Sequence, residues 1–194
     1  SFAIDWDGDP ELEIIAGRTV YDTDGSVIWT DSGGDGAAAV GDFDLDGNVV
    51  ESFGGGLFIW PHGIDVGPDG GVWVTDAVSD NNIPDGDERG HLVYKFSQTG
   101  EVLLRLGTPG RLGSGRDSFN SPSDVVVAPN GDVFIADGHN NDGNNRVVKF
   151  TDDGQFIMSW GQTGYAPGEF RALHAIEMDS RGRIFVGDRS NNRV

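Results

Sequence analysis

The first acidic run of the chain has the residue types and spacing of a calcium-binding loop. Asp5, Asp7 and Asp9 alternate along it, Gly8 lies inside it, and Glu13 follows. Hard cations such as Ca²⁺ need several oxygen ligands that converge from a short loop, and alternating carboxylates around a glycine supply them. We therefore predict a calcium site at these residues. The alternative is that the alternating acids form a solvated face.

A second acidic run repeats part of this pattern at Asp42, Asp44 and Asp46. The residue expected to complete the cage is Val50, and Glu51 falls one place late. We predict a second calcium site here, with a less complete set of carboxylates from the chain and the same alternative of a solvated acidic face.

Two histidines occupy the same place in an internal repeat. Three segments align without gaps: 61–76, 122–137 and 173–188. Within them His62, Ser123 and His174 are equivalent, and equivalent positions of radially arranged repeats converge on one axis. Neutral imidazoles are common zinc ligands, so we predict that His62 and His174 face each other and bind zinc or another channel metal. The alternative is a pair of structural histidines.

These candidates need a fold that repeats short strands about one axis. Each aligned segment predicts an innermost strand, a turn of the Pro-Asp-Gly kind, and a second strand ending in aspartate. Third and fourth strands are predicted at 92–96 and 102–106, and again at 147–150 and 156–160. Radially repeated four-stranded antiparallel sheets are the blades of a β-propeller, so the predicted fold class is all-β.

The length of the chain limits how many blades it can form. Its 194 residues have room for about four blades of roughly 40–50 residues each. The last repeat is only half complete at Val194, so we expect a fragment of a longer propeller or one that closes by association. Differences in length between the repeats fall in two loops rich in Asp, Asn and Gly, at 77–91 and 138–145.

Other residues that recur in the repeats are predicted to have a structural role. Asp76, Asp137 and Asp188 end the second strand of each repeat, and Arg146 and Arg193 recur in Asn-Asn-Arg segments. We predict that these acids cap turn amides or pair with the arginines. Aromatic residues at matching positions are predicted to form the core: Trp73, Phe96, Phe134, Phe150, Trp160 and Phe185.

The net charge of the chain limits the classes of binding partner that we expect. A net charge of −19 opposes binding to nucleic acid or an anionic membrane and suits metal cations, although acidity also serves solubility. The absence of cysteine excludes disulfides and thiolate sites, and no apolar run approaches the ~20 residues of a membrane span. We expect an extracellular or periplasmic protein that binds metal ions and a peptide or another protein.

From about Val49 onward the chain resembles the NHL-repeat family. The resemblance rests on Asn-Asn-Arg-Val before a strand, a glycine after the fourth strand, and Phe-x-x-Pro or Phe-x-x-Leu before the next blade. The segments 57–64, 72–76, 119–124 and 186–189 resemble, more narrowly, its peptidyl-hydroxyglycine amidating lyase branch. This resemblance implies a six-bladed propeller for a complete member of the family.

The first quarter is different and resembles another kind of propeller repeat. Its two acidic runs are similar to the calcium loops of FG-GAP or VCBS repeats. We therefore predict an FG-GAP/VCBS-like repeat over residues 1–48, followed by NHL-type blades over residues 49–194, the last of them incomplete.

The resemblance to amidating lyases implies roles for particular residues. In that family three histidines hold a zinc near the axis, and a tyrosine and arginines act on the substrate. By alignment His62 and His174 match two zinc ligands, and Arg189 matches an active-site arginine. The third ligand would lie beyond Val194, the tyrosine position holds His139, and the upstream arginine has no match. His139 then serves as a third ligand or as an acid–base group, or it is a loop residue hydrogen-bonded to Asp142 or its neighbours.

Two functions from different classes follow. The first is a calcium-stabilised extracellular propeller that serves as a binding or structural module. The second is a zinc-dependent lyase that cleaves a peptidyl-α-hydroxyglycine to a peptide amide and glyoxylate. The fold alone does not decide between them, because propellers host many unrelated functions.

Overall fold

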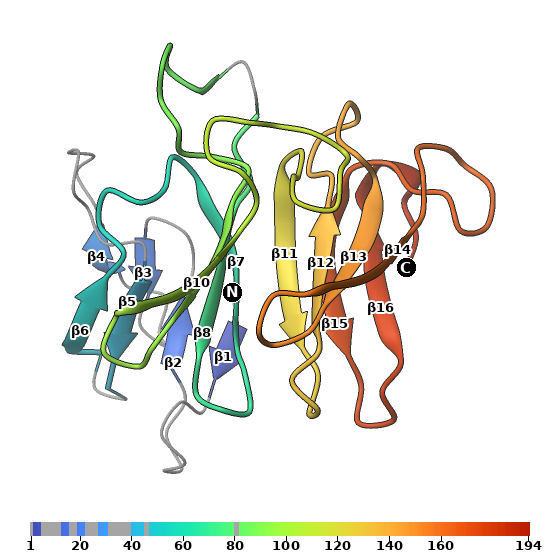
Figure 1. Cartoon of the computed structure of the whole chain (residues 1–194). Coiled ribbons are helices and arrows are strands. Elements are labelled where there is room, and N and C mark those ends of the chain that lie inside the picture. The colour runs from blue at the N-terminus through green and yellow to red at the C-terminus, as the bar shows by residue number, and fades with distance from the viewer. Residues whose placement is uncertain are drawn as a thin grey trace.

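The computed structural model of the chain is all-β (Figure 1). It describes residues 2–4, 13–15, 19–21, 27–30, 40–44, 47–79 and 82–194. Its strands form antiparallel sheets, and the two four-stranded sheets stand side by side in Figure 1. No helix among the described residues is long and apolar enough to cross a membrane.

Two of the sheets have four strands each, as expected for propeller blades. The first consists of β7 (Pro61–Val66), β8 (Val72–Asp76), β9 (Val93–Phe96) and β10 (Val102–Leu106). The second consists of β11 (Pro122–Val127), β12 (Val133–Asp137), β13 (Arg146–Phe150) and β14 (Phe156–Trp160). The prediction of an all-β fold with four-stranded antiparallel sheets is confirmed. The two third strands begin one residue away from their predicted starts.

The remaining sheets have two strands each. At the C-terminal side β15 (Leu173–Met178) pairs with β16 (Ile184–Asp188), and the 3₁₀ turn η2 (Arg189–Asn191) follows. The N-terminal pairs are β1 (Phe2–Ile4) with β2 (Glu13–Ile15), β3 (Thr19–Tyr21) with β4 (Val27–Thr30), and β5 (Val40–Phe43) with β6 (Val49–Phe53). The described residues thus form two complete four-stranded blades. The domain boundary between residues 48 and 49 stays a prediction, and the β5–β6 hairpin crosses it.

The hydrophobic core lies between neighbouring sheets. Successive side chains of a strand point to opposite faces, so Trp73 of β8 packs toward the second blade while Val72 and Val74 pack on the other side. Val126 and Leu173 join the second blade to the β15–β16 sheet in the same way. Most of the predicted aromatic core is confirmed, but Phe185 is 41% exposed because it lies on the outer face of the two-stranded sheet.

The innermost strands β7, β11 and β15 are neighbours, and each carries a bulge at the same place. The pairing register shifts between Pro61 and Ile64, between Pro122 and Asp124, and between Leu173 and Ala175. A bulge leaves an extra residue outside the ladder and changes the direction of its side chain. His62, Ser123 and His174 all lie in these bulges.

Carboxylates connect one innermost strand to the next. Asp65 of β7 accepts a hydrogen bond from the amide of Val127 in β11 (2.6 Å), and Asp124 of β11 accepts one from the amide of Ile176 in β15 (2.9 Å). Burial raises the pKa of Asp65 to about 6 and that of Asp124 to about 7. These bonds fix the spacing of the three strands on which the candidate site depends.

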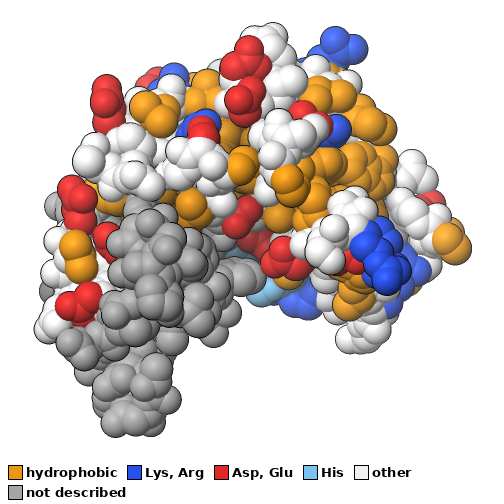
Figure 2. Space-filling model, turned by 90° about the horizontal axis from the view of Figure 1, so that it is seen from below, with side chains coloured by type: hydrophobic (Ala, Val, Ile, Leu, Met, Phe, Trp, Pro, Cys, Tyr) orange, Lys and Arg blue, Asp and Glu red, His pale blue; other side chains and the backbone are white. Residues whose placement is uncertain are grey.

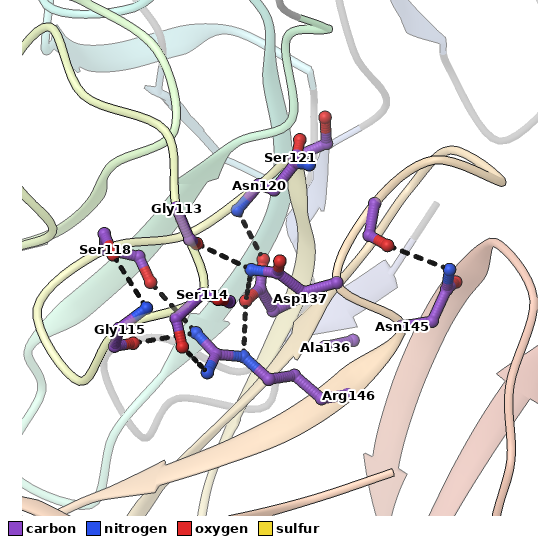
Figure 3. A network of polar contacts seen from close by, with 12 residues as sticks. Gly113, Ser114, Gly115, Ser118, Asn120, Ser121, Ala136, Asp137, Asn145 and Arg146 are labelled. Carbon is purple, nitrogen blue, oxygen red and sulfur yellow. Dashed lines mark hydrogen bonds and ion pairs between the residues drawn. The ribbon is translucent and has the colours of Figure 1, made fainter. Parts of the chain in front are cut away.

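A second set of buried acids anchors the chain at the end of each second strand. Asp137 accepts hydrogen bonds from the Asn120 amide (2.7 Å), the Asn144 side chain (2.7 Å) and Arg146 Nε (2.8 Å) (Figure 3). Asp188 makes the equivalent bonds to the Arg171 amide, Asn191 and Arg193. The predicted scaffold role of these acids and arginines is confirmed.

The backbone conformation explains why the second residue of each Asn-Asn-Arg segment is an asparagine. Asn145 and Asn192 have φ of 51° and 54°, a left-handed conformation that asparagine tolerates better than most residues. His91 occupies the same place before β9 with φ of 55°. Its Nδ1 accepts the Ser121 amide (3.0 Å) as Asn145 Oδ1 accepts the Ala172 amide (2.7 Å), so His91 has a structural role.

We expect Arg146→Ala to destabilise the protein strongly. Its guanidinium also donates to the carbonyls of Ser114, Gly115 and Ser118, and its loss would leave the fully buried Asp137 carboxylate without its cation. Removing one partner of a buried ion pair costs about 3–5 kcal/mol of unfolding free energy. Urea unfolding measures this cost, with Arg183→Ala as the control, because that side chain is 62% exposed in its pair with Asp179. Equal losses in the two variants would contradict the assignment.

Candidate metal centre

Three histidines from separate parts of the chain meet at the axial strands. His62, His139 and His174 each offer a ligand nitrogen, and these atoms lie within 4.8 Å of one another. The ring centroids are 4.7 Å apart for His62 and His139, 5.1 Å for His62 and His174, and 5.2 Å for His139 and His174. The prediction that His62 and His174 face each other is confirmed, and this cluster can bind a metal ion.

The bulged strands and one loop position the three rings. His62 lies in β7 and His174 in β15, while His139 begins the loop that follows β12. The His139 amide donates to the Ser121 carbonyl (2.8 Å), and its side chain is only 6% exposed. Its Nδ1 lies 3.4 Å from Asn140 Oδ1, a neighbour of Asp142 in the same loop.

The protonation of His62 is fixed by a backbone contact. Its Nδ1 lies 2.7 Å from the Ser123 carbonyl oxygen, which can only accept, so Nδ1 carries the proton and Nε2 keeps a lone pair for a metal. Gly63 makes this approach possible. A Cβ added there would lie 2.5 Å from Asp124 Cα and 2.8 Å from the Ser123 oxygen, which would force β7 away from β11.

All three imidazoles favour the neutral form. Burial lowers the pKa of His62, His139 and His174, and that of His139 falls to about 4, with further lowering by the neighbouring histidines and Arg189. A metal ligand must be deprotonated, so a neutral cluster is ready to bind. Three nitrogen donors at this spacing fit Zn²⁺, which accepts imidazole readily, better than Ca²⁺, which prefers oxygen.

Arg189 adds a positive charge beside the cluster. It is the first residue of η2, and its Nη2 donates to the His139 carbonyl (2.8 Å). Its side chain is exposed, so most of its N–H groups remain available to a ligand. In the space-filling view, histidine side chains reach the surface beside both acidic and basic groups (Figure 2).

The structure describes only some residues of the predicted calcium sites. Asp5, Asp7, Asp9 and Asp46 lie outside the described residues, and Glu13 is in β2. Asp42 lies in β5, and Asp44 accepts hydrogen bonds from the amide (2.7 Å) and the side chain (2.8 Å) of Asn48. Calcium in either loop therefore stays a prediction.

Sequence reasoning missed one aromatic residue at the edge of the histidine cluster. Trp60 precedes Pro61 and His62, and its ring centroid lies 5.1 Å from that of His139 and 5.8 Å from that of His62. Trp60 is only two residues before His62 in the sequence. This closeness to a predicted metal ligand was the signal that could have identified it.

The fold and the site define an all-β domain of four-stranded antiparallel sheets with a histidine cluster that can bind a metal. The NHL repeat model matches residues 58–82 and 119–150, which include His62 but precede His174. This match confirms the NHL resemblance over the matched residues. The resemblance of residues 1–48 to FG-GAP or VCBS repeats lies outside the match and stays a prediction.

Particular relatives have names that concern peptide amidation. The chain is 38% identical over 153 residues to peptidyl-glycine alpha-amidating monooxygenase B of Xenopus laevis, covering 75% of this chain and 16% of that protein. It is 33% identical over 150 residues to the probable peptidyl-alpha-hydroxyglycine alpha-amidating lyase of Caenorhabditis elegans, covering 75% and 39%.

Another relative is named only by its repeats. NHL repeat-containing protein 3 of Homo sapiens is 36% identical over 141 residues, covering 69% of this chain and 38% of that protein. The chain therefore spans between 16% and 39% of the length of these relatives. Among solved structures, virginiamycin B lyase of Staphylococcus aureus has a TM-score of 0.43 and 18% identity, over 66% of this chain and 34% of that one.

We expect His139→Ala to weaken zinc binding by more than about 100-fold, because losing a direct ligand costs at least as much as losing a group that merely supports one. Isothermal titration of the metal-free protein with Zn²⁺ measures the change. Asn141→Ala is the matched control in the same loop, since Asn141 is exposed and only its backbone carbonyl accepts a hydrogen bond, from the Asn145 side chain. Unchanged affinity in His139→Ala would limit the metal site to His62 and His174.

Proposed function

We propose that the chain is the metal-dependent catalytic part of a lyase that cleaves the C–N bond of a peptidyl-α-hydroxyglycine. The observation that carries this proposal is the convergence of three neutral imidazoles with a free arginine beside them. The names of the related amidating proteins support the choice of substrate. Secretion to an extracellular or periplasmic space belongs to the same proposal.

His62, His139 and His174 would hold a zinc ion in this reaction. When bound, such an ion polarises a substrate oxygen and makes its O–H group more acidic. The three rings arrive from β7, the loop after β12, and β15, so the site depends on the packing of adjacent sheets. With His139 as the third ligand, the site has the three protein ligands that are typical of a catalytic zinc.

Arg189 would bind and orient the substrate carboxylate. Guanidinium groups pair with carboxylates through two parallel hydrogen bonds, a geometry that a lysine cannot reproduce. The bond from Nη2 to the His139 carbonyl holds one side of the guanidinium against the loop that carries a metal ligand. A carboxylate on the remaining N–H groups would thus be oriented relative to the three histidines.

The reaction is balanced without any additional oxidant or reductant. The hydroxyl of the α-hydroxyglycine loses its proton, its oxygen forms the carbonyl of glyoxylate, and the C–N bond breaks. The released amide nitrogen takes up a proton, which gives the peptide amide.

We expect the zinc-loaded protein to release glyoxylate from an N-acylated α-hydroxyglycine peptide. Arg189→Ala should lower kcat/KM by about 100-fold or more, since a charged ligand group loses its partner, and Arg189→Lys should restore only part of it. A colorimetric assay for glyoxylate measures the rates, and Arg183→Ala is the control arginine. A zinc-loaded wild-type protein that releases no glyoxylate would exclude this function.

The second candidate is a calcium-stabilised binding or structural module. A relative named by its repeats, NHL repeat-containing protein 3, is 36% identical to this chain, between the 33% and 38% of the two amidating proteins, so the similarity alone does not select the lyase. The hydrogen bonds from Asn48 to Asp44 support the calcium-stabilised module, because they hold one of the predicted calcium ligands in a fixed position.

Calcium at 100-fold above its Kd should raise the melting temperature by about 5–10 °C. The measurement uses the His139→Ala variant, so that the histidine cluster does not contribute. Asp7→Asn and Asp44→Asn test the two loops separately. No change in melting temperature with calcium would remove the calcium part of this candidate.

A further inference from the structure

Trp60 is an exposed aromatic residue at the edge of the histidine cluster. Its side chain belongs to none of the three hydrophobic clusters of the described residues, and 40% of the residue remains exposed. Trp73, by contrast, is 1% exposed in the core between the blades. Packing of hydrophobic side chains within the described part of the chain therefore does not explain why a tryptophan occupies position 60.

The backbone of Trp60 is fixed at the entrance to β7. Its amide donates to Asp76 Oδ1 (3.0 Å), and its carbonyl accepts from the Ala77 amide (3.0 Å). Asp76 is fully buried and also accepts the Ile59 amide (2.8 Å). The backbone that carries the indole is thus rigid, so a ligand that contacts the indole would cause a smaller loss of conformational entropy.

The contacts of the ring place it beside the proposed reaction. The indole meets His139 and His62 edge to face, at 5.1 and 5.8 Å, while Arg189 reaches the carbonyl of the same His139 (2.8 Å). A ligand with its carboxylate on Arg189 and its reacting carbon at the histidines would have its neighbouring residue within reach of the indole. Among the described residues the indole N–H makes no hydrogen bond, which leaves it free for such a ligand.

We propose that Trp60 determines specificity by binding the apolar or aromatic side chain of the residue that precedes the α-hydroxyglycine. The proposal rests on the proposed lyase function and names a substrate subsite for it. A basic side chain is disfavoured at the same place, because Arg189 and a bound dication would both repel it. An apolar side chain gains the burial of two exposed hydrophobic surfaces.

Binding of unreactive dipeptides to the zinc-loaded protein tests the subsite directly. N-acetyl-Phe-Gly and N-acetyl-Ala-Gly carry the carboxylate but lack the hydroxyl, so isothermal titration gives their Kd without turnover. We expect the wild-type protein to bind the phenylalanine compound with a Kd about tenfold lower than that of the alanine compound. This is the size of effect expected for a buried contact with a tryptophan. Trp60→Ala should abolish that preference, and Trp60→Phe should retain most of it.

Controls separate the subsite from general damage. Phe185→Ala should keep the preference, because Phe185 is 41% exposed and its ring contact is with Arg183. Elemental analysis should find the same zinc content in Trp60→Phe as in the wild type. An unchanged preference in Trp60→Ala, a stronger affinity for N-acetyl-Lys-Gly than for N-acetyl-Phe-Gly, or no dipeptide binding by the wild type would overturn the proposal. A Trp60-dependent preference without glyoxylate release would support the subsite and exclude the lyase reaction.

Discussion

The buried carboxylate that ends each second strand is the interaction on which the rest of the structure depends. Asp76, Asp137 and Asp188 each accept main-chain amides from the segment that enters the innermost strand. That segment then continues into the bulge that carries His62, Ser123 or His174. Because the acid is out of water, its hydrogen bonds must be satisfied locally, and the path of the entering chain is fixed with them. The direction of the axial side chains follows from this anchoring.

Much of this arrangement could be predicted from the sequence because the fold is repetitive. The gapless alignment of three segments gave the strands, the turns, the scaffold acids and the facing pair of His62 and His174. Each of these depends on spacing within a repeat, which does not change from blade to blade. The exposure of Phe185 escaped prediction because it depends on how many strands lie beside it, and the repeat pattern alone does not contain that information.

The part of the site that could not be predicted lies between repeats. His139 has no equivalent histidine, since Val78 and Ser190 occupy its place in the other repeats. Its approach to His62 depends on the amide bond to Ser121 and on the spacing between sheets. Trp60 was missed for the same reason, because its neighbour His139 is distant in sequence. Residues that meet across blades leave no periodic signal, so only the folded chain brings them together.

The loop that carries His139 has a further consequence for how such a site can change over evolution. Two of the three histidines belong to strands whose length and register are held by the core, whereas the third belongs to the segment between β12 and β13. Insertions and substitutions are tolerated in surface loops far better than in buried strands. A propeller of this kind can therefore gain, lose or exchange its third metal ligand while every blade stays intact.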